Sequence, residues 1–245
     1  MNNTKKQKVF LTGGTAGIGR ATALLLVENG YDVFLIGRQE SKLQDLMDDY
    51  QKGAYEGHLE GKLIDVTDHK ALDQVWNNYI SNYGCPDVLI NNVGIPYQSV
   101  MEQKDLSLDY LVNTNLWSYM WLSGTISNAM IQHQVEGDII HMGSMSASVR
   151  EEGSSAYVAT KSGIQGFSEA FRKEVNPHNI RVTLIEPGSV GTDMQTTSPE
   201  EEQTLQQKME MLKAEDIAQM VLFVLRQPKA VNIASMSIKP LRQFI

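Results

Sequence analysis

The chain of 245 residues contains a single cysteine, Cys85, and no long apolar run. A single cysteine excludes a disulfide within the chain, is typical of a reducing compartment, and is expected here as a small buried residue. A transmembrane helix needs about 20 consecutive apolar residues, and no stretch approaches that length. The first eight residues are polar, and no apolar segment of signal-peptide length follows them. These features predict a cytoplasmic protein without a membrane-spanning segment.

Positive charge is also scarce. The chain has 21 lysines and arginines against 29 aspartates and glutamates, which gives a net charge of −8, and no basic cluster stands out. A nucleic-acid surface requires such a cluster, so no nucleic-acid partner is expected. Histidine, cysteine and acidic residues nowhere show the spacing of a metal site, so no metal is expected either. The hydrophobic residues, 42 % of the chain, are enough for a sizeable core.

Short apolar strands alternate with amphipathic helices along the chain. Strands are expected at 9–11, 31–36, 59–64, 86–90, 137–142, 180–185 and 231–238. Helices are expected at 20–28, 41–50, from Thr67 or Asp68 to 83, at 107–134, 155–174 and 214–226, with 196–211 as a short helix or mobile flap. This alternation predicts an α/β fold: a parallel sheet of about seven strands with helices on both faces. No repeat or linker divides the chain, so residues 1–245 are expected to form one domain.

A glycine-rich loop, Thr12 to Gly19, lies between the first strand and the first helix. Strand, glycine loop and helix together can hold a phosphate, because the backbone comes close and the helix N-terminus offers free N–H groups. The glycines do not have the G-x-G-x-x-G spacing. The alternative is that they only allow a tight turn.

The end of the second strand carries Gly37 and Arg38. In a dinucleotide-binding fold an acidic residue here would bind a ribose 2′-hydroxyl, whereas an arginine suits a 2′-phosphate. We therefore favour NADP(H) over NAD(H); the alternative for Arg38 is a solvated side chain. Asp65, at the end of the third strand, is placed where it could meet the adenine ring.

Tyr157 and Lys161 lie four residues apart in a predicted helix, which places both side chains on one face. A neighbouring cation favours the phenolate, so we expect the pKa of Tyr157 to be lowered. A phenol tuned in this way could give a proton to a carbonyl oxygen or take one from an alcohol. The alternative is a packed tyrosine beside a solvated lysine.

The unusual residues fall at the carboxyl ends of the predicted strands, where ligands gather in open parallel sheets. Four motifs there resemble those of the short-chain dehydrogenase/reductase family. They are Thr12-Gly13-x-x-x-Gly17-x-Gly19, Asn91-Asn92-Val93-Gly94, Ser144 thirteen residues before Tyr157-x-x-x-Lys161, and Pro187-Gly188 with Thr192. The resemblance covers nearly the whole chain and implies a Rossmann-like fold, NAD(P)(H) binding and a homotetramer or dimer. It also implies an oxidoreductase that interconverts alcohols with aldehydes or ketones.

The resemblance assigns the catalytic roles. Tyr157 would be the acid/base, and Lys161 would lower its pKa and bind the nicotinamide ribose. Ser144 would hold the substrate oxygen, and Asn115 would anchor a water that links Lys161 to solvent. The residues expected to bind the cofactor are Gly13, Thr15, Gly17, Ile18, Gly19, Arg38, Asp65, Val66, Asn92, Gly94, Tyr157, Lys161, Pro187, Gly188, Val190 and Thr192.

Some positions depart from the family pattern or stay open. The departures are Ala16, which is not basic, Val93 in place of alanine, His141 in place of asparagine and Gly143 in place of serine. The segment from Ala230 to Pro240 resembles the branch that acts on small 3-hydroxy acids, serine and related aldehydes.

Other readings also remain open. Arg150 could grip a substrate carboxylate or join Glu151 and Glu152 in a surface cluster. Trp117 and Trp121 are expected in the core or at a subunit contact. The alternative functions are a non-catalytic NADP(H)-binding scaffold or regulator, and an epimerase or lyase with tightly held cofactor. The walls of the substrate pocket are expected from residues 95–104 and 188–202.

Overall fold

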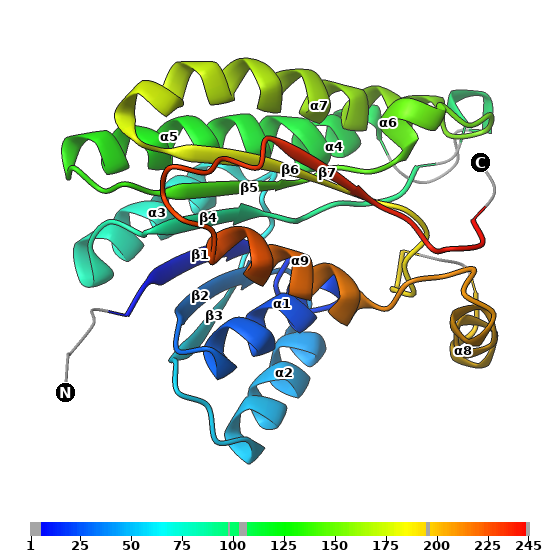
Figure 1. Ribbon diagram of the computed structural model, residues 1–245, viewed down its shortest axis with the longest axis horizontal. Helices are drawn as coiled ribbons and strands as arrows, with labels where there is room; N and C mark the ends of the chain where they lie inside the picture. The colour runs from blue at the N-terminus through cyan, green and yellow to red at the C-terminus, as the bar shows by residue number, and fades with distance from the viewer. Residues whose placement is uncertain (1–5, 98, 103–106, 195–196, 244–245) are drawn as a thin grey trace.

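A computed structural model describes residues 6–97, 99–102, 107–194 and 197–243. Seven parallel strands form one sheet in the order β3-β2-β1-β4-β5-β6-β7 (Figure 1). The strands are β1 (Lys8–Thr12), β2 (Asp32–Gly37), β3 (Leu59–Leu63), β4 (Val88–Asn91), β5 (Asp138–Met142), β6 (Arg181–Pro187) and β7 (Ser235–Ile238). The order reverses between β1 and β4, the position at which open α/β sheets bind their ligands. The predicted Rossmann-like fold is confirmed.

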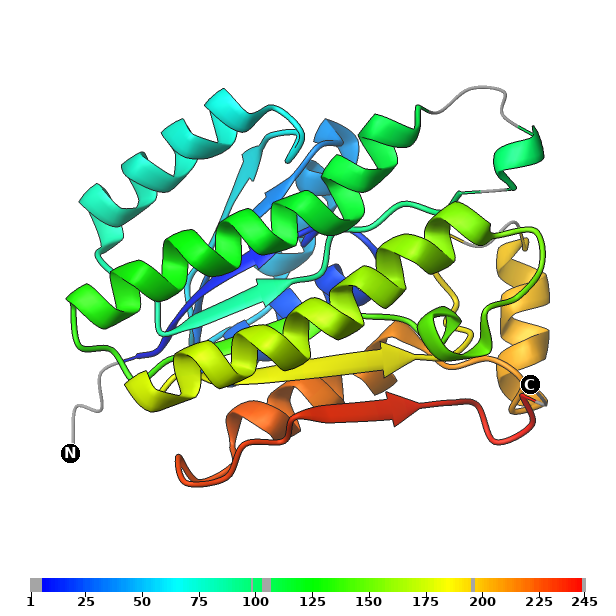
Figure 2. The same ribbon diagram turned by 90° about the horizontal axis from the view of Figure 1, so that it is seen from above.

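Helices cover both faces of this sheet. The helices of the described chain are α1 (Gly17–Glu28), α2 (Glu40–Lys52), α3 (His69–Tyr83), α4 (Leu108–Val112), α5 (Ser118–Gln132), α6 (Ser146–Val149), α7 (Ser155–Val175), α8 (Pro199–Gln207) and α9 (Ala214–Leu225). Helices α1, α2 and α9 pack on one face of the sheet, and α3, α5 and α7 pack on the other. Figure 2 shows α3, α5 and α7 running alongside one another. Successive strand residues face opposite layers: Val9 and Leu11 contact the first set of helices and Phe10 contacts the second.

The observed boundaries lie close to the predicted ones, with two exceptions, and the short helix α6 has no predicted counterpart. The predicted start of the last strand is wrong, because β7 begins at Ser235 rather than Val231. The predicted helix 107–134 is interrupted by a π-helical turn, Asn113–Trp117, between α4 and α5. The segment predicted as a short helix or flap contains α8, although its first residue, Thr196, lies outside the described residues. The pocket-wall positions Gln98, Gln103, Lys104 and Gln195 also lie outside them.

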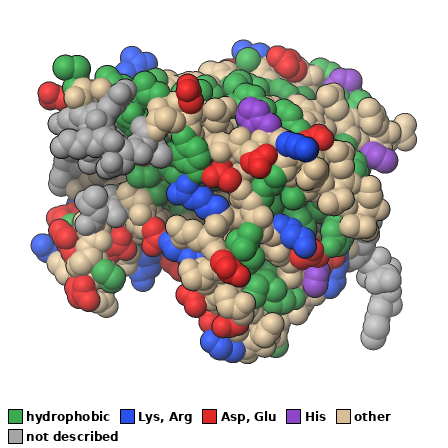
Figure 3. All heavy atoms as spheres, turned by 180° about the vertical axis from the view of Figure 1, so that it is seen from behind, with side chains coloured by type: hydrophobic (Ala, Val, Ile, Leu, Met, Phe, Trp, Pro, Cys, Tyr) green, Lys and Arg blue, Asp and Glu red, His purple; other side chains and the backbone are tan. Residues whose placement is uncertain are grey.

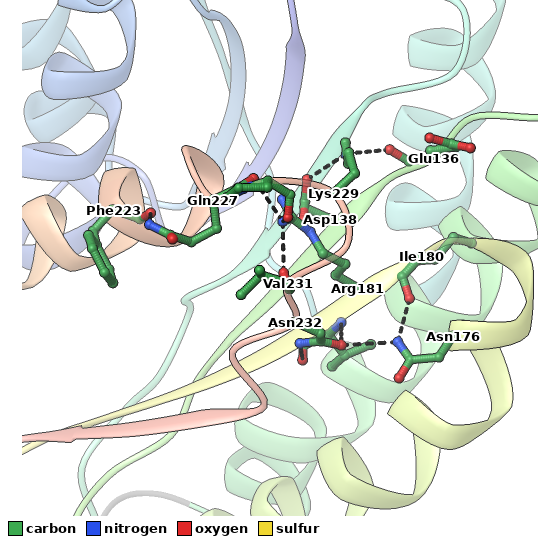
Figure 4. A network of polar contacts seen from close by, with 12 residues as sticks. Glu136, Asp138, Asn176, Ile180, Arg181, Phe223, Gln227, Lys229, Val231 and Asn232 are labelled. Atoms are coloured by element: carbon green, nitrogen blue, oxygen red, sulfur yellow. Dashed lines mark hydrogen bonds and ion pairs between the residues drawn. The ribbon is translucent and has the colours of Figure 1, made fainter.

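Buried polar contacts hold the amino ends of β5 and β6 together (Figure 4). The Arg181 guanidinium donates to Asp138 at 2.6 Å, and both side chains are almost fully buried. The same guanidinium donates to the carbonyl oxygens of Gln227, Pro228 and Val231, which connect α9 to β7. This network fixes the segment between α9 and the edge strand β7. It lies at the amino ends of the strands, opposite the carboxyl ends.

The surface carries charges of both signs. On the face shown in Figure 3, basic and acidic side chains are interspersed with apolar ones. Trp117 and Trp121 are partly buried and pack against the core formed by α3, α5 and α7, which agrees with the core reading of these residues. In the described part of the chain, no helix combines the length and apolarity that a membrane crossing requires. Cys85 is buried, as expected.

Candidate active site

A cavity of about 660 Å³ opens at the carboxyl ends of the strands, large enough for a cofactor or drug-sized ligand. Its walls come from the glycine loop, the ends of β2 to β6, the start of α7 and the chain after β6. Every residue predicted for the site lines this cavity except Gly19 and Asn115. The parallel sheet therefore brings residues that are widely separated in the sequence together around one cavity.

The glycine loop is shaped for a close approach of backbone to ligand. Gly13 has a φ of +65°, a conformation that side chains rarely adopt. A Cβ on Gly19 would lie 2.0 Å from the carbonyl oxygen of Gly13, so Gly19 allows α1 to begin directly behind the loop. The first turn of α1 has no acidic residue that would occupy its free N–H groups. These residues fit the phosphates of a dinucleotide.

The predicted nucleotide-binding Asn92 ties the glycine loop to β4. Its side-chain amide donates to the carbonyl oxygens of Thr12 at 3.1 Å and Gly13 at 3.0 Å. The Thr12 hydroxyl accepts from the backbone N–H groups of Asn92 and Val93. Asn92 therefore holds the loop in place as well as lining the cavity.

At the far end of the cavity, Arg38 contacts a residue that sequence reasoning missed. Its guanidinium donates to the Tyr110 hydroxyl at 2.5 Å, and that hydroxyl donates to Asp65 at 2.6 Å. Burial raises the pKa of Asp65, but hydrogen bonds from Tyr110 and Thr67 and the charge of Arg38 outweigh it, so the pKa lies below its usual value. Asp65 is thus a charged acceptor that organises the ends of β2 and β3.

Tyr157 and Ser144 meet at the opposite end of the cavity. Tyr157 stands in the first turn of α7, and Ser144 follows β5. Burial raises the pKa of Tyr157, a hydrogen bond with Ser144 acts in the other direction, and the charge of Glu151 raises it again; the net direction is upward. The predicted lowering of this pKa is therefore wrong for this structure, because burying a phenolate costs more free energy than its hydrogen bond with Ser144 returns.

Lys161 is buried one turn along α7 from Tyr157, with a side chain 3 % exposed. Its ammonium donates to the carbonyl oxygen of Met142 at 2.9 Å and lies 5.8 Å from the centroid of the Tyr157 ring. Burial lowers the pKa of Lys161 to about 8. The alternative of a solvated lysine is excluded. Gly94 stands opposite, and a Cβ there would come within 3.7 Å of the ammonium nitrogen.

Asn115 lies in the π-helical turn rather than on the cavity wall. Such turns occur often at functional sites, because they redirect the side chains of one helical turn. The Asn115 side chain accepts from the N–H of Ile95 and donates to its carbonyl oxygen, both at 2.9 Å. It therefore anchors the loop that follows β4 beside the Tyr157 end of the cavity.

The segment after β6 closes the remaining side. The N–H of Gly188 donates to Ile238, and the N–H of Ser189 donates to the side chain of Gln243 at 3.0 Å. Gln243 is a second lining residue that the sequence did not indicate. Thr192 comes so close to Gly17 that a Cβ on that glycine would lie 3.0 Å from the threonine methyl group.

The residues 150–152, considered together from sequence, separate in the structure. Arg150 is exposed, and its Nε points to the carbonyl oxygen of Ala147 rather than lining the cavity. Glu152 is exposed as well. Glu151, interpreted from sequence as a surface charge, instead lines the cavity. The loop between α6 and α7 turns it inward, which no local pattern indicated.

His141, which departs from the family pattern, is a core residue. It is fully buried and its two ring nitrogens contact the hydroxyls of Ser123 at 2.9 Å and Ser168 at 2.7 Å. Ser168 donates to the Ile164 carbonyl and so accepts from Nδ1–H, which leaves Nε2 to accept from Ser123. Burial lowers its pKa to about 3. It serves the packing of β5 against α5 and α7.

Comparisons with known proteins agree with this geometry. The family description "short chain dehydrogenase" matches residues 7–203. An uncharacterised oxidoreductase of Staphylococcus saprophyticus is 29 % identical over 251 residues, covering 99 % of each chain. A 3-oxoacyl-[acyl-carrier-protein] reductase of Salmonella typhimurium is 33 % identical and covers 76 % of this chain and 74 % of its own. Among solved structures, the closed form of serine dehydrogenase complexed with NADP+ has a TM-score of 0.83 at 25 % identity, covering 98 % and 97 % of the two chains.

Proposed function

This chain belongs to the short-chain dehydrogenase family of NAD(P)-dependent oxidoreductases, and on that premise we propose that it is an NADP(H)-dependent enzyme with Tyr157 as its acid/base. It interconverts a primary or secondary alcohol with the aldehyde or ketone. The observation that carries the proposal is the meeting of Ser144, Tyr157 and Lys161 at one end of a cavity that has Arg38 at its other end.

The protein supplies orientation and proton transfer. When bound, the nicotinamide ring of the cofactor donates or accepts the hydride. The raised pKa of Tyr157 keeps the phenol protonated near neutral pH, so it is ready to donate to a carbonyl oxygen as negative charge develops there. The Ser144 hydroxyl holds the same oxygen. The buried Lys161 ammonium stabilises the phenolate that remains.

Two features support a preference for NADP(H). Arg38 offers a guanidinium, which suits a 2′-phosphate. At Gly37, where an acidic residue would select a 2′-hydroxyl, a Cβ would lie 2.5 Å from the Thr15 methyl group. The similar serine dehydrogenase structure also contains NADP+.

A homo-oligomer, dimer or tetramer, is part of the proposal, as is a cytoplasmic location. Large apolar side chains remain exposed along α4 and α5, which supports burial of this face between subunits. They are Leu108, Val112, Met120 and Ile131, between 36 % and 43 % exposed.

The acid/base role is tested with Tyr157→Phe. We expect kcat/KM for NADPH-dependent reduction of an aldehyde or ketone to fall by about 10²–10⁴-fold, the usual contribution of a positioned proton donor. NADPH binding, followed by its fluorescence, should survive. Tyr83→Phe, at a tyrosine outside the cavity, is the matched control. Full turnover by Tyr157→Phe would reject the assignment, and binding without turnover in the wild type would favour the scaffold alternative.

The cofactor preference is tested with Arg38→Ala. We expect the Kd for NADPH to rise about tenfold or more, since a charge-assisted contact of about 1.5–3 kcal/mol is lost, with little change for NADH. Lys52→Ala, in the last turn of α2, controls for the loss of a surface cation. Equal losses for both cofactors would discard the 2′-phosphate role.

A further inference from the structure

Glu151 has one carboxylate oxygen that is satisfied and one that is not. Oε1 accepts a hydrogen bond from the Ser146 hydroxyl. Oε2 is buried and has no hydrogen-bond partner. A buried oxygen of this kind costs about 1–3 kcal/mol, more if it is charged, and native proteins rarely leave one unmatched. Because Glu151 lines the cavity, the missing partner can come from the molecule that occupies it.

The other charges on the cavity wall are already matched. Lys42 forms an ion pair with Asp193, and Arg38 is linked to Asp65 through Tyr110. Lys161 donates to a backbone carbonyl. Among the described charged residues of the wall, Glu151 therefore stands apart in having an oxygen without a donor.

A short chain of contacts places Glu151 beside the reacting groups. Its partner Ser146 donates its backbone N–H to the Ser144 hydroxyl oxygen at 3.2 Å. Ser144 in turn contacts Tyr157, whose pKa responds to the charge of Glu151. Arg150 ends α6 in the left-handed conformation, with a φ of +59°, so the chain changes direction just before Glu151. The carboxylate thus lies close to the position of the substrate oxygen.

We propose that Glu151 binds a protonated amine of the substrate, so that the enzyme prefers alcohols and carbonyl compounds with an ammonium group near the reacting carbon. This inference rests on the proposed function, because it assumes that the substrate lies between Ser144 and Tyr157. An ammonium group supplies both the donor and the opposite charge that a buried carboxylate requires. The Tyr97 hydroxyl is another buried oxygen without a partner among the residues that line the cavity.

A carboxylate substituent at this place fits poorly. Glu151 would repel it, and the exposed Arg150 does not line the cavity. A methyl group would leave Oε2 without a donor. The three substituents therefore rank in the order ammonium, methyl, carboxylate.

Three alcohols that differ only in this substituent test the ranking. They are 1-amino-2-propanol, 2-butanol and 3-hydroxybutyrate, oxidised with NADP+ near pH 8, where the amine is largely protonated. We expect kcat/KM of the wild type to be about tenfold higher for the amine than for 2-butanol, and lowest for the acid. In Glu151→Gln the ratio of amine to 2-butanol should fall about tenfold, mainly through KM. Glu152→Gln, which removes the neighbouring exposed carboxylate, should keep the wild-type ratio.

The outcomes separate the inference from the proposed function. Turnover of these alcohols with the same ratio in the wild type and in Glu151→Gln would overturn the ammonium site and leave the oxidoreductase assignment intact. A wild type that binds NADPH yet turns over none of these compounds would overturn the ammonium site, and one that also turns over none of a broad panel of alcohols, aldehydes and ketones would reject the proposed function. Circular dichroism and NADPH affinity of each variant show that the fold is retained.

Discussion

The hydroxyl of Tyr110 donates to Asp65 at 2.6 Å and accepts from the Arg38 guanidinium at 2.5 Å, which links α4 to the ends of β2 and β3. Arg38 is thereby held at the cavity wall by a residue 72 positions away in the sequence. The same tyrosine ring lies 5.9 Å below the guanidinium carbon. Preorganisation of a long side chain reduces the entropy that is lost when an anion binds.

Tyr110→Phe should therefore weaken NADPH binding selectively. Loss of a hydrogen bond worth about 0.5–1.5 kcal/mol corresponds to a roughly two- to tenfold rise in the Kd for NADPH. The Kd for NADH should change less, because it has no 2′-phosphate for Arg38 to contact. Fluorescence titration of both cofactors measures the difference, with Tyr50→Phe on α2 as the control. A larger loss for NADH than for NADPH would contradict this role for Tyr110.

Gly19→Ala should destroy cofactor binding as a whole. Its Cβ would lie 2.0 Å from a backbone oxygen that cannot move without displacing the loop. We expect affinity for NADPH and NADH to fall together by at least about tenfold, because the phosphate contacts are shared. Gly166→Ala in α7 is the matched control: nothing lies within 4 Å of its Cβ, and alanine should stabilise the helix by about 0.5–1 kcal/mol. Normal binding by Gly19→Ala would show that the close approach is not required.

The stability of the protein should depend on pH through Lys161. Its pKa is lowered to about 8 from 10.5, so between these values the unfolded chain binds more protons than the folded one. The free energy of unfolding of the wild type should then rise with pH across this window, by up to about 3 kcal/mol, relative to Lys161→Met. Urea unfolding of both proteins at several pH values measures this difference. If the difference in unfolding free energy between the two proteins does not change with pH, burial does not destabilise the ammonium form of Lys161.

Removing the Arg181 side chain should destabilise the sheet without touching the cavity. Arg181→Met removes the buried guanidinium from Asp138 and leaves the half-exposed Lys229 as its remaining ion-pair partner, so we expect a loss of about 3 kcal/mol, the lower end for buried pairs. The exposed pair of Arg172 and Glu169 is the contrast, since Arg172→Met should cost at most about 1 kcal/mol. Urea denaturation gives both values. Similar losses of unfolding free energy in the two variants would show that the buried pair stabilises the protein no more than the surface pair.

The sequence by itself determined the order of strands and helices, the glycine loop and the spacing of Ser144, Tyr157 and Lys161. These are local patterns of apolar periodicity and motif spacing, and strands that all run parallel bring their carboxyl ends together without further information. Two features were predicted wrongly: the π-helical turn around Asn115 and the start of β7. Both depend on tertiary contacts, such as that of Asn115 with Ile95.

Only the tertiary structure decided which isolated side chains reach the site and how their protons are held. Tyr110 on α4, Glu151 in the loop before α7 and Gln243 after β7 line the cavity because the fold brings these distant segments to it, and no local pattern distinguishes them from surface residues. The direction of the Tyr157 pKa also follows from the fold, since burial depends on every element that surrounds the phenol. Spacing along a helix shows which groups are neighbours, whereas desolvation is a property of the whole packed site.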